Sequence, residues 1–119
     1  MNKGPVYEKS YAFALDIIKL YQHLLASKEY VFSKQLLRSG TSIGANINEA
    51  SAGQSKNDFI AKMSIASKEA RETLYWLKLL HDSSLIEINI QKYIAQSEEL
   101  VRLLTAIVKT SQTKLPTKH

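Results

Sequence analysis

The sequence predicts an all-α fold, an antiparallel up-down-up-down bundle of four helices, on three observations. Both prolines lie near the ends of the 119-residue chain, at Pro5 and Pro116, so the residue that most strongly breaks helices is absent between them. Apolar residues recur at alternating spacings of three and four along successive segments, as in helices buried along one face. No segment sustains the period-two alternation of a half-buried strand.

The first helix is expected to carry two apolar stripes side by side. The stripe that we predict to face the core comprises Tyr7, Tyr11, Ala14, Ile18, Tyr21 and Leu25. The additional stripe comprises Phe13, Ile17, Leu20 and Leu24. A four-helix core needs one stripe per helix, so the additional stripe is expected to contact a partner subunit. The alternative is a wide core stripe in a small bundle.

The second helix follows Ser33, a candidate N-cap, and is expected to stop at Gly53. Its core stripe comprises Leu36, Gly40, Ile43, Ile47 and Ala50. Gly40 and Gly44 lie one turn apart, and each costs about 1 kcal/mol of helix propensity relative to alanine. We therefore expect the two glycines to let another helix pack closely.

The third helix is predicted to begin at Ser55, with Asp58 completing a capping-box-like start, and to end at residues 82–84. Its stripe comprises Phe59, Met63, Ala66, Ala70, Thr73, Leu77 and Leu80. The fourth helix is predicted to follow Asn89 as its cap. Its core stripe comprises Ile90, Ile94, Ser97, Val101, Leu104 and Val108, and its additional stripe Tyr93, Leu100, Leu103 and Ile107. Short connections make consecutive helices antiparallel, which predicts a bundle over residues 1–112 and a basic tail over 113–119.

Composition excludes several classes of protein. The chain has no cysteine, so disulfide frameworks, zinc ribbons and thiol nucleophiles are excluded. Sixteen Lys and Arg against eleven Asp and Glu leave a net charge of +5, which favours anionic partners. No targeting segment is visible, and charged residues interrupt every apolar stretch before it could span a bilayer. A cytoplasmic location without membrane contact is the expectation.

Enzymatic chemistry is not expected. Residues 40–44 match the G-x-S-x-G pattern of a nucleophile elbow, but that motif needs a preceding strand and these residues follow a predicted helical segment. A di-metal bundle site needs Glu-x-x-His on two helices, whereas Leu20 and Lys78 stand three residues before His23 and His81. The sequence therefore predicts no catalytic residue, metal site or cofactor.

Two sets of polar residues are candidates for binding. One is a row on the second helix, a ligand-binding or inter-subunit seam or else a solvated face: Arg38, Ser42, Asn46 and Glu49. The other gathers at the end of the bundle that holds both termini, where it would meet a phosphate backbone: Lys3, Lys9, Lys56, Lys62, Lys109, Lys114 and Lys118. The aromatic pair Tyr75 and Trp76 could stack on bases, but core or interface packing is the favoured interpretation.

Two motifs at their proper separation resemble one known family. A Ser-Ile-x-x-Asn-x-x-Glu pattern runs from Ser42 to Glu49, and a Glu-x-x-Tyr-Trp-Leu pattern runs from Glu72 to Leu77. The chain resembles the four helix bundle protein family, also called the 23S rRNA intervening-sequence or S23 family, over residues 10–108. The motif's Asn and Glu correspond to Asn46 and Glu49, without an assigned role.

The resemblance implies more than the residue patterns do. Members are bacterial, some being encoded within intervening sequences of large-subunit rRNA genes. They fold as antiparallel four-helix bundles and assemble as homopentamers. A related group, the accessory proteins of diversity-generating retroelements, binds nucleic acid and a reverse transcriptase. The expected function is a non-catalytic oligomer that binds nucleic acid, or a nucleic-acid-associated protein, through a basic rim. The alternative is an interaction scaffold whose charge only maintains solubility.

Overall fold

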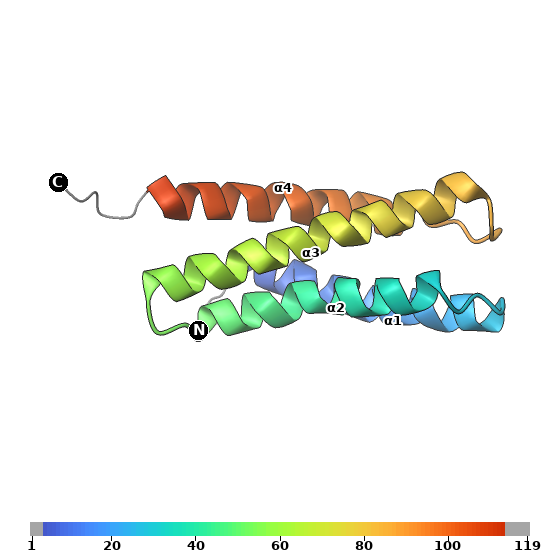
Figure 1. Ribbon diagram of the computed structural model, residues 1–119, viewed down its shortest axis with the longest axis horizontal. Helices are drawn as coiled ribbons and strands as arrows, with labels where there is room; N and C mark the ends of the chain where they lie inside the picture. The colour runs from blue at the N-terminus through green and yellow to red at the C-terminus, as the bar shows by residue number, and fades with distance from the viewer. Residues whose placement is uncertain (1–3, 114–119) are drawn as a thin grey trace.

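The computed structural model describes residues 4–113, and these form four helices without a strand. The helices are α1 (Gly4–Ala26), α2 (Phe32–Ser51), α3 (Lys56–Ser83) and α4 (Gln91–Thr113). Figure 1 shows their short connections at alternating ends of the molecule, so consecutive helices run antiparallel. The predicted all-α four-helix fold is confirmed. Residues 1–3 and 114–119, which include most of the predicted tail, lie outside the described residues.

The helices pack as the four edges of a square bundle. Within the described residues, each helix contacts the two helices next to it, and the diagonal pairs make no contact. The contact between α1 and α4 is the smallest of the four. Antiparallel neighbours with one apolar stripe each can bury those stripes together at the centre, which is what this arrangement does.

The core-facing side of α1 differs from the prediction. The buried residues of α1 are Val6, Ser10, Phe13, Ile17, Leu20 and Leu24. The additional stripe therefore faces the core, and the stripe predicted for the core lies outward, with Tyr11 66% and Ile18 40% exposed. Both stripes fit the helical period equally well, so periodicity could not rank them. Packing did, because Phe13 and the aliphatic side chains carry no polar atom, whereas each tyrosine hydroxyl needs a hydrogen-bond partner or water.

The predicted faces of α2 and α3 are confirmed. All five residues of the α2 stripe are buried, and in α3 only Phe59 at the start of the stripe is partly exposed. In α4, four stripe residues are buried, Val101 and Val108 are partly buried, and Leu100 of the additional stripe is 1% exposed. The wide-stripe alternative thus holds for part of α4, where burial extends around the helix.

Gly40 allows α1 and α2 to approach closely, as predicted. A Cβ atom placed on Gly40 would lie 3.0 Å from both Cγ1 and Cγ2 of Ile17. At Gly44 it would meet the backbone oxygen of Ser10 at 3.4 Å. The propensity cost of Gly40 is therefore offset by a contact between the helices that a larger residue would disturb.

Two of the predicted N-terminal caps are confirmed and one is wrong. The Asp58 N–H donates to Ser55 Oγ at 3.1 Å, and the Gln91 N–H donates to Asn89 Oδ1 at 3.1 Å. Ser33, however, lies inside α2, and its buried hydroxyl has no hydrogen-bond partner in the described part of the chain. The helix end is satisfied by Glu29, a residue that the sequence pattern did not single out.

Glu29 caps α2 from the preceding connection. Its carboxylate accepts the N–H groups of Val31 and Phe32 at 2.9 Å and that of Ser33 at 2.7 Å. These donors belong to the first turn, where N–H groups have no partner within the helix. A cap predicted from a short serine side chain was wrong because the longer glutamate side chain folds back over the helix end. Among the described residues, no helix is long and apolar enough to cross a membrane.

Candidate functional site

The polar row predicted on α2 is continuous along the helix. The Ser42 hydroxyl donates to the carbonyl oxygen of Arg38 at 2.7 Å, and the Asn46 side-chain amide donates to that of Ser42 at 2.9 Å. Glu49 is exposed at the far end of the row. Ser42 and Asn46 thus direct part of their hydrogen-bonding capacity to their own helix.

Arg38 joins α2 to α3. Its Nη1 lies 3.1 Å from Oε1 of Glu69, and its Nη2 donates to the carboxylate of Glu72. The indole N–H of Trp76 donates to the same Glu72 carboxylate at 3.1 Å. The Trp76 hydrogen bond, followed by the bond and charge of Arg38, lowers the pKa of Glu72, and these carboxylates raise the pKa of Arg38. Arg38 is therefore engaged within its own subunit, as a link between two helices.

The Glu72 network predicts a pH dependence of stability. A carboxyl group whose pKa is lowered by folding stabilises the folded state above its ordinary value of 4.5, and this contribution is lost as the pH falls through the lower folded value. Trp76→Phe removes the first cause of the shift while keeping an aromatic ring against the core. We expect the loss of unfolding free energy between pH 7 and pH 3 to be smaller in the variant by up to about 1 kcal/mol.

Urea unfolding at both pH values measures this difference. Glu72→Gln, which cannot titrate, should reduce the pH dependence at least as much as Trp76→Phe. Identical pH dependence in wild type and both variants would show that the Glu72 network is not linked to folding.

The described residues of the basic end lie on three helices. Lys56 and Lys62 belong to the first two turns of α3 and Lys109 to the last turns of α4, and Figure 1 places both helix ends at the same end of the bundle. None of these three lysines forms an ion pair within residues 4–113. Lys9 of α1 differs, because its Nζ lies 3.2 Å from Oε2 of Glu99 on α4. The other three predicted lysines, Lys3, Lys114 and Lys118, lie outside the described residues.

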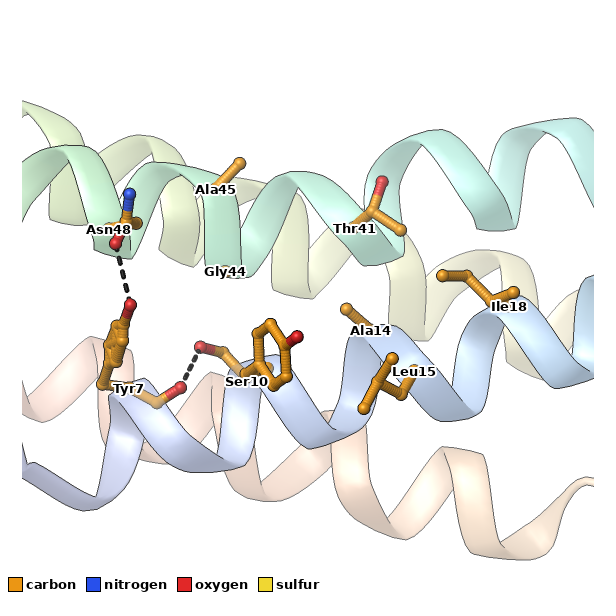
Figure 2. Close-up of a pocket in the computed structure, with 10 residues that line it drawn as sticks. Tyr7, Ser10, Ala14, Leu15, Ile18, Thr41, Gly44, Ala45 and Asn48 are labelled. Atoms are coloured by element: carbon orange, nitrogen blue, oxygen red, sulfur yellow. Dashed lines mark hydrogen bonds between the residues drawn. The ribbon is translucent and has the colours of Figure 1, made fainter.

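An uncharged groove lies between α1 and α2, and Figure 2 shows its walls. Its volume is about 500 Å³, and its lining residues are Tyr7, Ser10, Tyr11, Ala14, Leu15, Ile18, Thr41, Gly44, Ala45 and Asn48. The Tyr7 hydroxyl donates to Asn48 Oδ1 at 2.8 Å across one end of the groove. None of the lining side chains carries a charge, although 23% of the chain is charged.

The α1 wall of this groove is unusually apolar for an exposed surface. Tyr11 is 66% exposed, Leu15 48% and Ile18 40%, and the opposite wall contributes the small residues Gly44 and Ala45. Contiguous exposed apolar surface of this kind is typical of a protein–protein contact. Sequence reasoning placed the partner contact of α1 on the Phe13 stripe and missed Leu15. The missing information was the orientation of α1 toward the core.

Comparison with known proteins gives two similarities. A family model for 23S rRNA-intervening sequence proteins matches residues 2–106. A crystal structure of a protein of unknown function from the S23 ribosomal protein family of Bacteroides thetaiotaomicron is 49% identical, with a TM-score of 0.85. That similarity covers 92% of this chain and 99% of the other. Among curated proteins, none matches the chain.

Proposed function

The chain belongs to the family of 23S rRNA-intervening sequence proteins, and from this premise we propose that it is a non-catalytic oligomeric bundle that binds nucleic acid through its basic end. The observation that carries the proposal is the group formed by Lys56, Lys62 and Lys109, three cations at one end without an acidic partner in the described residues. A net charge of +5 adds a long-range attraction for a polyanion.

Binding of this kind is electrostatic and independent of base sequence. Lysine ammonium groups neutralise phosphates and release condensed counterions, so affinity falls steeply as salt rises. The aromatic pair does not add a stacking platform at this end, because Tyr75 and Trp76 lie in the other half of α3 and Trp76 packs edge-on against Phe32. Contacts to the phosphate backbone therefore support the proposal better than contacts to bases.

Assembly is the second part of the proposal. The uncharged groove between α1 and α2 supports it, since an exposed apolar wall beside small residues can accept a helix of a second copy. A closed ring would place the basic end of every subunit on one rim, which multiplies the charge available to a phosphate backbone. Five subunits is the number that the family resemblance implies.

A second candidate function is an interaction scaffold without nucleic-acid binding. The same uncharged groove favours it, because that groove fits a protein partner and offers nothing to a polyanion. In this case the lysines would only keep the protein in solution. The two functions differ in one measurable property, the affinity for nucleic acid at low salt.

We predict that wild-type protein binds a fluorescein-labelled 20-nucleotide RNA at about 50 mM salt, measured by fluorescence anisotropy. The double variant Lys56→Gln/Lys62→Gln should bind several-fold more weakly. Each lost phosphate contact should flatten the log–log salt dependence by about 0.7, the value for single strands.

The matched control changes two exposed lysines at the opposite end, Lys34→Gln and Lys78→Gln, neither of which forms an ion pair among the described residues. This control should retain most of the affinity, although it removes the same charge. If wild-type protein leaves the anisotropy unchanged at 50 mM salt, the scaffold function is the correct one.

A further inference from the structure

A second groove lies between α3 and α4, in the half of the bundle that ends at Lys56 and Thr113. Its volume is about 260 Å³, and its lining residues are Ser64, Ser67, Arg71, Thr105, Val108, Lys109 and Gln112. Figure 1 shows α3 and α4 running toward this end of the molecule. Six of the seven lining side chains are polar or cationic, and none is acidic, so the groove is positive as well as polar.

The antiparallel packing of α3 and α4 creates this group. Ser64, Ser67 and Arg71 follow one another at spacings of three and four, which places them on one face of α3. On α4, Thr105 and Lys109 are one turn apart in the same way. Arg71 and Lys109 are 38 residues apart in the sequence, and only the fold brings them to one groove.

The two arginines of the bundle that contact α3 have opposite environments. Arg38 is held by the carboxylates of Glu69 and Glu72. Arg71 is held instead by a neutral group, since its Nη1 donates to Ser67 Oγ at 2.9 Å. Neither Arg71 nor Lys109 forms an ion pair in the part of the chain that the structure describes. Two cations without an acidic partner therefore line one groove.

Ser67 orients the guanidinium without neutralising it. The serine is 4% exposed, so its position is fixed by the packing of α3. Its oxygen accepts the bond from Arg71, which leaves the serine hydrogen and the remaining guanidinium N–H groups available to a ligand. A guanidinium with free N–H groups matches two oxygens of a phosphate in a bidentate arrangement.

We propose that the α3–α4 groove is a binding site for the phosphate backbone of a nucleic acid, with Arg71 and Lys109 as its cationic contacts. The hydroxyls of Ser64 and Thr105 and the amide of Gln112 are further hydrogen-bond donors at the same surface. The lining has no aromatic side chain on which a base could stack, so the site recognises backbone and not base sequence. This inference rests on the proposed function and locates its binding site.

The test compares two double variants in the anisotropy assay with the 20-nucleotide RNA. Arg71→Gln/Lys109→Gln removes the groove cations, and Lys56→Gln/Lys62→Gln removes the same charge from the same half of the bundle outside the groove. We expect the groove variant to lose about ten times more affinity than the control variant at about 50 mM salt. Its salt dependence should also be flatter.

A variant without a charge change sharpens the test. Ser67→Ala removes only the group that orients Arg71, so we expect RNA affinity to fall a few-fold while net charge and the melting temperature stay near wild type. Arg71→Lys, which keeps the charge and loses the bidentate geometry, should fall between wild type and the groove variant. A general electrostatic attraction would leave Ser67→Ala and Arg71→Lys unchanged, and that result would overturn the groove site.

The outcomes separate the inference from the proposed function. If wild-type protein does not bind the RNA, both fail. If wild-type protein binds and the two double variants lose equal affinity, the groove is not the site and the proposed function stands. A groove variant that loses more affinity than the control, together with a weakened Ser67→Ala, supports the groove. Circular dichroism at the assay temperature confirms that each variant is folded.

Discussion

Ile47→Asp is expected to unfold the protein or to reduce its free energy of unfolding by several kcal/mol. Ile47 is 2% exposed and belongs to the core cluster contributed by all four helices. An aspartate there must either bury an unpaired carboxylate or bind a proton, and both are costly. A domain of this size has a total stability of about 5–15 kcal/mol, so the loss is a large fraction of it. Thermal unfolding followed by circular dichroism measures it.

Two further variants make this prediction specific. Glu49→Asp introduces the same side chain two residues along, on the exposed side of α2, and should leave the melting temperature nearly unchanged. Ile47→Val, which removes one methyl group, should cost about 0.5–1.5 kcal/mol. A near-native melting temperature for Ile47→Asp would show that the core-facing side of α2 has been placed wrongly.

Leu15→Glu is expected to dissociate the proposed oligomer. Leu15 is 48% exposed in the wall of the uncharged groove, so a glutamate remains solvated in a single copy of the chain. Against a second copy the same carboxylate would be buried without a partner, and assembly would lose several kcal/mol per interface. Light scattering should give a multiple of 13.4 kDa for wild type, about five times that mass for a pentamer, and 13.4 kDa for the variant.

The control is Lys19→Glu, which places a glutamate at an exposed position of α1 that does not line the groove. It reverses a charge and should leave the mass of the oligomer unchanged. Circular dichroism should show that Leu15→Glu remains helical, since the substitution does not touch the core. A wild-type mass near 13.4 kDa at micromolar concentration would contradict the assembly itself.

The predicted fold was correct where local patterns carry the information. The core faces of α2 and α3 followed from apolar spacing, because each helix has a single apolar stripe and only one way to bury it. The caps at Ser55 and Asn89 followed from short-range hydrogen bonding that a few neighbouring residues specify. These features depend on residues within one or two helical turns, so a single sequence suffices to predict them.

The candidate sites were predicted less well, since they combine residues from different helices. Arg38 was assigned to a polar row on α2, yet its carboxylate partners lie on α3, more than thirty residues away. Arg71 was counted with the middle of the bundle, and its position beside Lys109 emerged only when α3 and α4 were placed together. The register between antiparallel helices has no local signature, which is why spacing along one helix could not predict these pairs.

The sequence alone therefore determined the number, type and order of the helices, and the core face of those with one apolar stripe. Tertiary packing decided which of two stripes on α1 is buried, which side chain caps α2, and which cations remain without an acidic partner. The physical reason is the range of the interactions. Hydrogen bonding and periodicity act within a few residues, whereas burial and charge pairing are settled between helices, where alternatives that look equivalent along the chain differ in the surroundings they meet.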